Sequence, residues 1–194
     1  LYLHLLLMLA LYAAFIRSVA IGTNPLTGPD AVSQIIGSVL SLTWLSAVPT
    51  LPVNHELMHR RHWFPRWAAQ ILGTFYGDPN RDIAHVRTHH LHLDTHRDSD
   101  TPLRGETMYR FMFRATWGAY ADSVQGEAER LRKQGRSAWH RSNRTYTLLL
   151  YLAAVPLTCY VFGGTGAMLI ALITLIFTKL LLEGFNYFQH YGLV

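Results

Sequence analysis

The sequence has 194 residues, half of them apolar, with a formal net charge of +5 at pH 7 and a single cysteine, Cys159. One cysteine excludes, within this sequence, a disulfide framework, an iron–sulfur cluster and a Cys-rich zinc site. The apolar residues are gathered into long runs instead of being spread with a helical or strand period, which is typical of membrane proteins.

Four apolar runs are predicted to be membrane-spanning helices. Residues 1–16 resemble the end of a spanning helix, because no basic region precedes them as it would in a signal peptide. Residues 31–52, 145–162 and 165–182 each approach the ~20 apolar residues that a helix needs to cross a bilayer. We therefore predict an all-α fold, a polytopic membrane helical bundle of the fatty-acid-desaturase-like kind, forming one domain over residues 1–194.

Both ends of the sequence interrupt a pattern. Leu1 lies inside an apolar run with no Met before it, and Val194 comes just after a His-bearing segment. We therefore expect the sequence to be a fragment of a longer protein, incomplete at both ends.

The loops predict an orientation in the membrane. The turn at 163–166 has no charge, whereas residues 60–144 hold 15 of the 17 Lys and Arg residues, all but Arg17 and Lys179. The positive-inside rule places the basic segment, which we bound at 54–144, in the cytoplasm. We expect a multi-pass protein of the bacterial inner membrane with two hairpin tips on the far side.

The basic segment also indicates the kind of partner. Its charge is expected to attract anionic lipid, so nucleic acid is not expected as a partner. Within it, the apolar patch at 67–77 is too short to span and is predicted to lie in the interface or to dip in and return. Residues 127–141 are predicted to form a charged surface helix and a turn, which either docks a protein partner or rests on headgroups.

Histidines carry the clearest chemical signal. Residues four apart share one face of a helix, so a pair with this spacing can reach one metal ion together. Of eleven histidines, six fall into such spaced sets at the predicted cytoplasmic face: His55, His59, His85, His89, His90 and His190. His90 adjoins His89 and points elsewhere, as a second ion would require. Imidazole suits iron, zinc, copper and nickel, so the ligand type does not name the metal.

The remaining histidines are not assigned to metal. His4 and His140 are predicted to be interfacial polar groups, and the roles of His62, His92 and His96 stay open.

The same residues permit other functions. HELMH, residues 55–59, matches the zinc-protease signature H-E-x-x-H, in which the glutamate, here Glu56, is the general base. A single zinc ion would leave most of the other clustered imidazoles without a ligand role. A metal carrier would need ligands along its spans, whereas these histidines gather at one surface. Two metal ions account for more of the residues than one.

Three segments resemble a known family. HELMHRRH (55–62), HVRTHH (85–90) and NYFQHYGLV (186–194) are similar to the histidine motifs of membrane-bound non-haem di-iron hydroxylases, relatives of the fatty acid desaturases. Their surroundings look specifically like the xylene monooxygenase branch. Alkane hydroxylases of this superfamily have an acidic residue and Gly where this sequence has Ala84 and Thr88, and a desaturase typically has an H-x-x-H-H third motif, which is not found here.

The resemblance implies a site and a reaction. It implies two iron ions bound by His55, His59, His85, His89, His90 and His190, with no catalytic residue beyond the metal ligands and with further histidines expected past Val194. It also implies O₂ as co-substrate and electrons from NADH through a separate iron–sulfur flavoprotein reductase. The implied reaction converts the methyl group of an apolar aromatic such as toluene or a xylene to the primary alcohol. An alkane hydroxylase or fatty acid desaturase is the alternative within the superfamily.

Supporting residues are proposed from the same pattern. Metal-bound imidazoles usually need a partner on the second ring nitrogen, for which the nearby acidic candidates are Glu56, Asp78, Asp82 and Asp94. Aromatic residues of the spans can line a substrate slot, although packing is their commoner role: Trp44, Phe177, Phe185, Tyr187 and Phe188.

One charged pair lies within an otherwise apolar helix. Lys179 and Glu183 are four residues apart. They are either a functional pair, as intramembrane charges often are, or an ion pair that extends its head groups to the cytoplasmic surface.

Overall fold

Helices make up most of the part of the protein that the computed structural model describes, residues 1–24, 26–85, 95 and 97–192. No strand occurs among these residues, so the predicted all-α class is confirmed. The helices are α1 (Tyr2–Ala20), α2 (Ala31–Ala47), α3 (Thr50–Met58), α4 (Trp63–Phe75), α5 (Arg81–Ala84), α7 (Met108–Lys133) and α8 (Arg144–His190).

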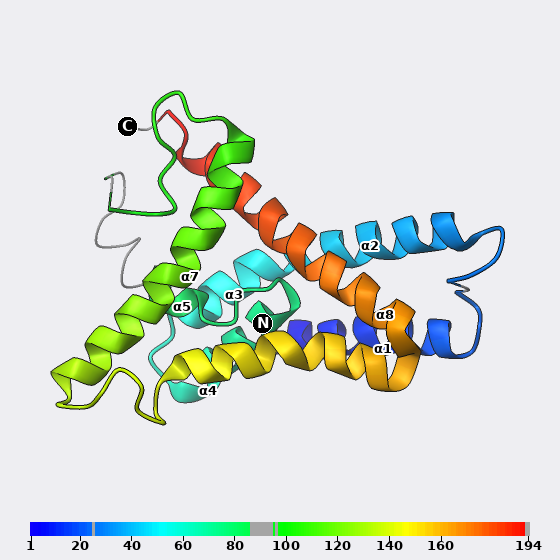
Figure 1. Cartoon of the computed structure of the whole chain (residues 1–194), viewed down its shortest axis with the longest axis horizontal. Helices are drawn as coiled ribbons and strands as arrows, with labels where there is room; N and C mark the ends of the chain where they lie inside the picture. The colour runs from blue at the N-terminus through cyan, green and yellow to red at the C-terminus, as the bar shows by residue number, and fades with distance from the viewer. Residues whose placement is uncertain (25, 86–94, 96, 193–194) are drawn as a thin grey trace.

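Three helical stretches are long and apolar enough to cross a membrane: Tyr2–Ala20, Ala31–Met58 and Arg144–His190. In Figure 1, α1, α2 and the bend of α8 extend together to one end of the molecule, and α8 contacts both α1 and α2. Val32, Ile36 and Leu40, four residues apart on α2, are all exposed. An apolar stripe on the outside of a bundle is stable when lipid surrounds it, as expected of a membrane protein.

Helix α8 consists of two arms joined at Gly164. This residue has φ 77° and ψ −174°, a conformation essentially restricted to glycine. The chain folds back there, as the change from yellow to orange in Figure 1 shows. The break falls inside the predicted uncharged turn at 163–166. The second arm continues to His190, eight residues past the predicted end of the span at 182. The polar residues on its inner face, such as Glu183 and Asn186, form ion pairs and hydrogen bonds within the protein, as described below.

The predicted span at 31–52 is interrupted. Helix α2 ends at Ala47 and α3 begins at Thr50. Pro52 has no amide proton to donate to the carbonyl of Val48, and its ring clashes with a helical carbonyl at that position. Val48 and Pro49, between the two helices, keep right-handed helical dihedrals, so the interruption removes backbone hydrogen bonds shortly before the first histidine motif without reversing the chain.

Helix α4 contains most of the patch at 67–77 that is predicted to lie in the interface. It packs against α1, α3 and α8 and buries Ala68, Leu72 and Phe75, while Trp63 and Trp67 stay exposed. Exposed tryptophans next to spanning helices suit the headgroup level of a membrane. The helix begins at the imidazole of His62, whose Nδ1 accepts a hydrogen bond from the amide of Phe64 at 3.3 Å. His62 therefore has a capping role.

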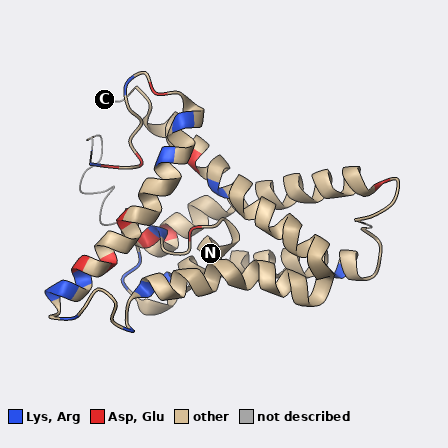
Figure 2. Cartoon of the chain, viewed as in Figure 1, with Lys and Arg blue, Asp and Glu red and all other residues tan. Residues whose placement is uncertain are grey.

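The predicted surface helix at 127–141 differs from the structure. Helix α7 begins at Met108 and ends at Lys133, and it crosses α5 and α8 (Figure 1). Glu127 is buried, with 1% of its surface exposed, and accepts a hydrogen bond from the amide of Arg144 at 2.9 Å. A carboxylate at the start of α8 satisfies an amide that has no intrahelical partner. Charged residues of both signs gather near the end of α7 at Lys133 (Figure 2).

Candidate metal centre

Three of the six predicted ligands lie together. His55 is in the last turn of α3, His59 follows its end, and His85 follows α5. One ring nitrogen of each lies within 4.8 Å of the others. The Nε2 atoms of His55 and His59 are 3.4 Å apart, and the ring of His85 is centred 4.9 Å from that of His55. Three converging imidazoles are a suitable donor set for one iron ion, so the residues present fit the metal that the resemblance implies.

A cavity of about 520 Å³ adjoins the cluster. His190, the last residue of α8, lines this cavity together with His55 and His85. The two helix ends that the predicted topology places on one side therefore meet. Its lining is Leu51, Pro52, His55, Glu56, Arg81, His85, Asp100, Asn186, Gln189 and His190. His89, His90, His92 and His96 lie outside the described residues.

Buried hydrogen bonds hold the segments that carry these histidines. The amide group of Asn54, next to His55, donates to the hydroxyl of Tyr76, which is fully buried at the end of α4. The hydroxyl of Tyr120 on α7 donates to the carbonyl of Gly77. The chain between α4 and α5 is thus fixed to α3 and α7.

Glu56 is placed differently from a protease base. Its side chain is 50% exposed and pairs with Arg60 at 2.5 Å. A general base must have its carboxylate free to take a proton near the metal, whereas the carboxylate of Glu56 is engaged by Arg60. This geometry does not favour the zinc-protease interpretation.

Two of the other acidic candidates form ion pairs with basic side chains. Asp78 pairs with Lys179 at 2.6 Å, and Asp82 holds Arg144 through both oxygens at 3.0 and 2.9 Å. The prediction that Asp78 and Asp82 orient imidazoles is therefore wrong for the described residues. Oδ2 of Asp78 accepts from Arg81 and Lys179, and its Oδ1 has no hydrogen-bond partner there. Both oxygens of Asp82 accept from Arg144. Burial raises the pKa of the Asp82 carboxyl, against the opposing effect of Arg144. Asp94 lies outside the described residues.

Lys179 and Glu183 are paired and buried. Their charged atoms are 2.5 Å apart, and their side chains are 4% and 0% exposed. Pairing across one turn is confirmed, whereas extension to the surface is wrong. The reason is that Asp78 and Arg81, which are distant in sequence, supply buried partners for both.

Arg81 is the centre of these contacts. Its guanidinium lies 3.1 Å from Asp100 and 3.4 Å from both Asp78 and Glu183. Burial raises the pKa of Asp100 to about 6, although Arg81 opposes the shift. We call Arg81, Lys179, Asp78, Asp100 and Glu183 the Arg81 cluster. The sequence analysis missed Arg81 and Asp100, and the only local signal was the position of Arg81, one helical turn before His85.

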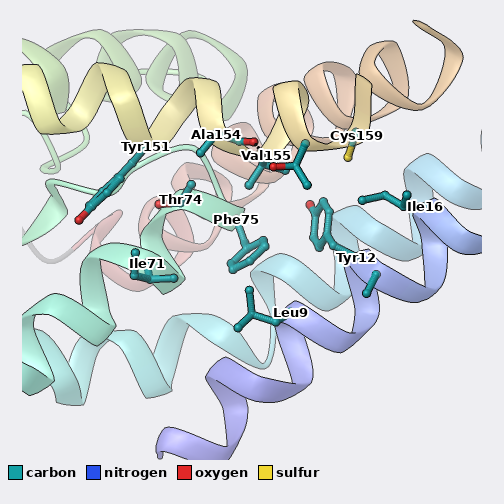
Figure 3. Close-up of a pocket in the computed structure, with 12 residues that line it drawn as sticks. Leu9, Tyr12, Ile16, Ile71, Thr74, Phe75, Tyr151, Ala154, Val155 and Cys159 are labelled. Atoms are coloured by element: carbon teal, nitrogen blue, oxygen red, sulfur yellow. Dashed lines mark hydrogen bonds between the residues drawn. The ribbon is translucent and has the colours of Figure 1, made fainter. Parts of the chain in front are cut away.

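A second cavity is apolar. It has a volume of about 260 Å³ and lies between α1, α4 and the first arm of α8 (Figure 3). The hydroxyls of Thr74 and Thr158 donate to carbonyls of their own helices, and that of Tyr12 bonds to Ser46. Its lining is Leu9, Tyr12, Ala13, Ile16, Ile71, Thr74, Phe75, Tyr151, Ala154, Val155, Thr158 and Cys159.

The aromatic residues proposed for a substrate slot line neither of the two cavities described above. Trp44, Phe177 and Phe188 are exposed on the surface of the bundle. Phe185 is partly buried, and the hydroxyl of Tyr187 donates to the carbonyl of Glu106 at 2.7 Å. Periodicity within a span does not tell a cavity-facing ring from a lipid-facing one, because every face of such a helix is apolar.

The chain is similar in sequence to several monooxygenases. The chain is 54% identical over 193 residues to the xylene/toluene monooxygenase hydroxylase component XylM of Pseudomonas putida, which is 100% of this chain and 52% of that protein. It is 29% identical over 186 residues to an alkane 1-monooxygenase of Ectopseudomonas oleovorans, covering 94% of this chain and 45% of the relative. It is 31% identical over 169 residues to alkane 1-monooxygenase 2 of Pseudomonas aeruginosa, covering 84% and 43%.

The chain spans about half the length of the curated relatives that it matches. The sequence profile of the fatty acid desaturase family matches residues 32–194, which include all the predicted ligands and every described residue of the Arg81 cluster. The chain belongs to the fatty acid desaturase family.

Proposed function

We propose that the chain is the metal-binding part of a membrane monooxygenase that converts a methyl group of an apolar aromatic hydrocarbon, such as toluene or a xylene, to the primary alcohol. The observation that carries this proposal is the convergence of His55, His59 and His85 beside His190. The 54% identity to the hydroxylase component of a xylene/toluene monooxygenase supports the choice of reaction.

Two non-haem iron ions are the proposed metals. The proposed ligands in this chain are His55, His59, His85, His89, His90 and His190. When bound, iron supplies the reductive activation of O₂, which amino-acid side chains do not provide. One oxygen atom enters the C–H bond of the methyl group, and the other leaves as water with two protons and two electrons. The proposed electron source is NADH, through a separate iron–sulfur flavoprotein reductase.

The residues of the chain have binding and positioning roles in this proposal. The imidazoles hold the metal at the ends of α3, α5 and α8, where polar residues such as Asn186 and Gln189 also line the cavity. The buried ion pairs hold those ends against one another. Rigid support of this kind keeps ligands in a productive geometry.

The apolar cavity is the proposed hydrocarbon-binding site. Three of the hydroxyls in its lining, those of Tyr12, Thr74 and Thr158, already bond within the protein, so an apolar guest leaves these bonds intact. The cavity volume of about 260 Å³ is sufficient for a single methylated ring. Phe75 lines this cavity, and the next residue, Tyr76, bonds to Asn54 beside His55. Through Phe75 and Tyr76 the lining of the apolar cavity is connected to the segment that carries the first histidine motif.

The proposed location is the bacterial inner membrane, with the metal centre on the cytoplasmic side. The segment that links the spans on that side carries most of the basic residues. Electrons from a cytoplasmic reductase and a substrate from lipid would then meet at one surface.

Metal content of the full-length parent protein, purified in detergent, tests the metal centre. We expect about two iron ions per chain and a sharp loss in His59→Ala. His62→Ala is the matched control, because His62 lies in the same motif but caps α4, and it should keep its iron. One zinc ion in place of iron would overturn the proposal and favour a protease.

Oxidation assays test the substrate. With a reductase and NADH, toluene or xylene should yield the benzylic alcohol at a higher kcat/KM than a linear alkane. The reverse preference would favour alkane hydroxylation, which the relatives at 29 and 31% identity make the nearest alternative.

A further inference from the structure

We propose that Arg81 is a positioning residue of the metal centre, which acts by fixing His85 and the end of α8 to each other. The inference rests on the proposed function, because it requires His85 to bind a metal. It assigns a role to a buried charge cluster that the oxidation chemistry itself does not use.

Arg81 and His85 are directly coupled through the backbone. Arg81 is the first residue of α5 and His85 follows the last, so the two are four residues apart, one helical turn. The guanidinium is buried, with its side chain 4% exposed. It also lines the cavity that His55, His85 and His190 share. A displacement of Arg81 would therefore move the backbone that presents His85.

Three carboxylates hold the guanidinium, and they come from three different segments. Asp78 precedes α5, Asp100 lies between α5 and α7, and Glu183 lies in the second arm of α8. Arg81 is thus held by groups on several sides instead of by one exposed pair. Planar guanidinium groups suit such multiple contacts, because their donors have fixed directions.

The same cluster also fixes the position of the last turns of α8. Glu183 accepts hydrogen bonds from Lys179 at 2.5 Å and from Asn186 at 2.7 Å. It lies seven residues, about two turns, before His190. Since Arg81 contacts Glu183, one set of ion pairs links the segment of His85 to the helix of His190.

The charge of the cluster complements a bound cation. Two cationic side chains, Arg81 and Lys179, face three carboxylates, so the cluster carries one formal negative charge in excess. Buried charges are costly unless they are well paired, and a hydrophobic replacement is often as stable. The excess negative charge lies beside the metal cavity, where it would favour a bound cation. We therefore attribute the buried cluster to a role in metal binding.

Arg144 provides a matched control. It pairs with Asp82, the neighbour of Arg81 on α5, at 2.9 Å, and it lies at the other end of α8. Its side chain is 32% exposed, and it is not among the residues that line the metal cavity. Removal of this pair should affect stability without affecting the metal.

The experiment uses the full-length parent protein in detergent, with iron removed and Co²⁺ added, because the visible absorption of Co²⁺ depends on its ligands and their geometry. We expect Arg81→Gln to change the Co²⁺ spectrum and to weaken Co²⁺ affinity by about 10- to 100-fold, as loss of a group that orients metal ligands does. Arg81→Lys should restore the affinity in part. Arg144→Gln should lower the thermal midpoint and leave the spectrum unchanged.

The outcomes separate the possible failures. An unchanged spectrum in folded Arg81→Gln, or an equal change in Arg144→Gln, would overturn the inference. If Arg81→Gln does not fold, Asp100→Asn replaces it, since this change keeps the shape of one partner and removes its charge, and an unchanged Co²⁺ spectrum there also overturns the inference. A wild-type protein that binds neither Co²⁺ nor iron contradicts the proposed function itself.

Discussion

The ammonium group of Lys179 lies 2.6 Å from the carboxylate of Asp78, although the two residues are 101 positions apart in the sequence. This contact joins the second arm of α8 to the chain between α4 and α5. Both partners are buried, at 4% and 1% exposure of their side chains. Removal of either residue alone would therefore leave a buried charge without its partner and lower the free energy of unfolding.

Lys179→Met should destabilise the protein strongly. It leaves Asp78 and Glu183 with one cation fewer in a buried site, which typically costs about 3–5 kcal/mol. Thermal unfolding in detergent measures the effect, and Lys179→Arg should retain much of the stability. A change in midpoint of less than a degree for the Met variant would show that the pair contributes little.

Gly73→Ala should distort the support of the metal centre. A Cβ atom at Gly73 would lie 2.6 Å from the carbonyl oxygen of Asp78 and 2.8 Å from Cα of Pro79. These are backbone atoms that cannot rotate away, so the cost should be about 1–3 kcal/mol. Gly37→Ala is the control, because nothing lies within 4 Å of its Cβ position, and it should be neutral or slightly stabilising. Equal midpoints for the two variants would contradict the prediction.

Glu106 should contribute stability that is lost in acid. Hydrogen bonds from Arg114 hold the pKa of the Glu106 carboxyl below its ordinary value of 4.5, despite burial. The folded state thus binds a proton more weakly than the unfolded state does. The contribution is complete above about pH 4.5 and disappears as pH falls through the folded-state pKa.

Glu106→Gln tests this dependence. The thermal midpoint of the wild type should exceed that of the variant at neutral pH, and the difference should narrow below about pH 4.5. Arg114 also donates to the carbonyls of Ser99 and Thr101, so the loop beside Asp100 should loosen with it. A difference that stays constant down to pH 3.5 would show that the Glu106–Arg114 contact is not responsible.

Ala13→Leu should narrow the apolar cavity. Ala13 lines it on α1 and the adjacent Ala14 does not, although both residues are exposed. If the cavity binds the substrate, Ala13→Leu should raise KM for xylene on the order of tenfold, and Ala14→Leu should leave it unchanged. An equal KM in both variants would place the substrate elsewhere, without bearing on the metal centre.

The local patterns of the sequence predicted the elements that depend on few residues. The spans follow from apolar runs, because insertion in lipid depends on the segment itself. The pairing of His55 with His59, and of Lys179 with Glu183, follows from helical spacing. The turn at Gly164 follows from consecutive small residues between two apolar runs. Each of these features is determined by the residues of a single continuous segment.

Only the tertiary structure decided which polar groups are buried and with what. Helical spacing placed Glu183 beside Lys179 but did not show that Arg81 would join them, and Glu127 resembled a solvated residue until α8 was found to begin at its carboxylate. The energy of a charge depends on the groups within a few ångströms of it, and these come from distant segments. The sequence therefore determined the spanning helices and the His55–His59 pair, whereas packing decided that the Arg81 cluster would hold the segments around them.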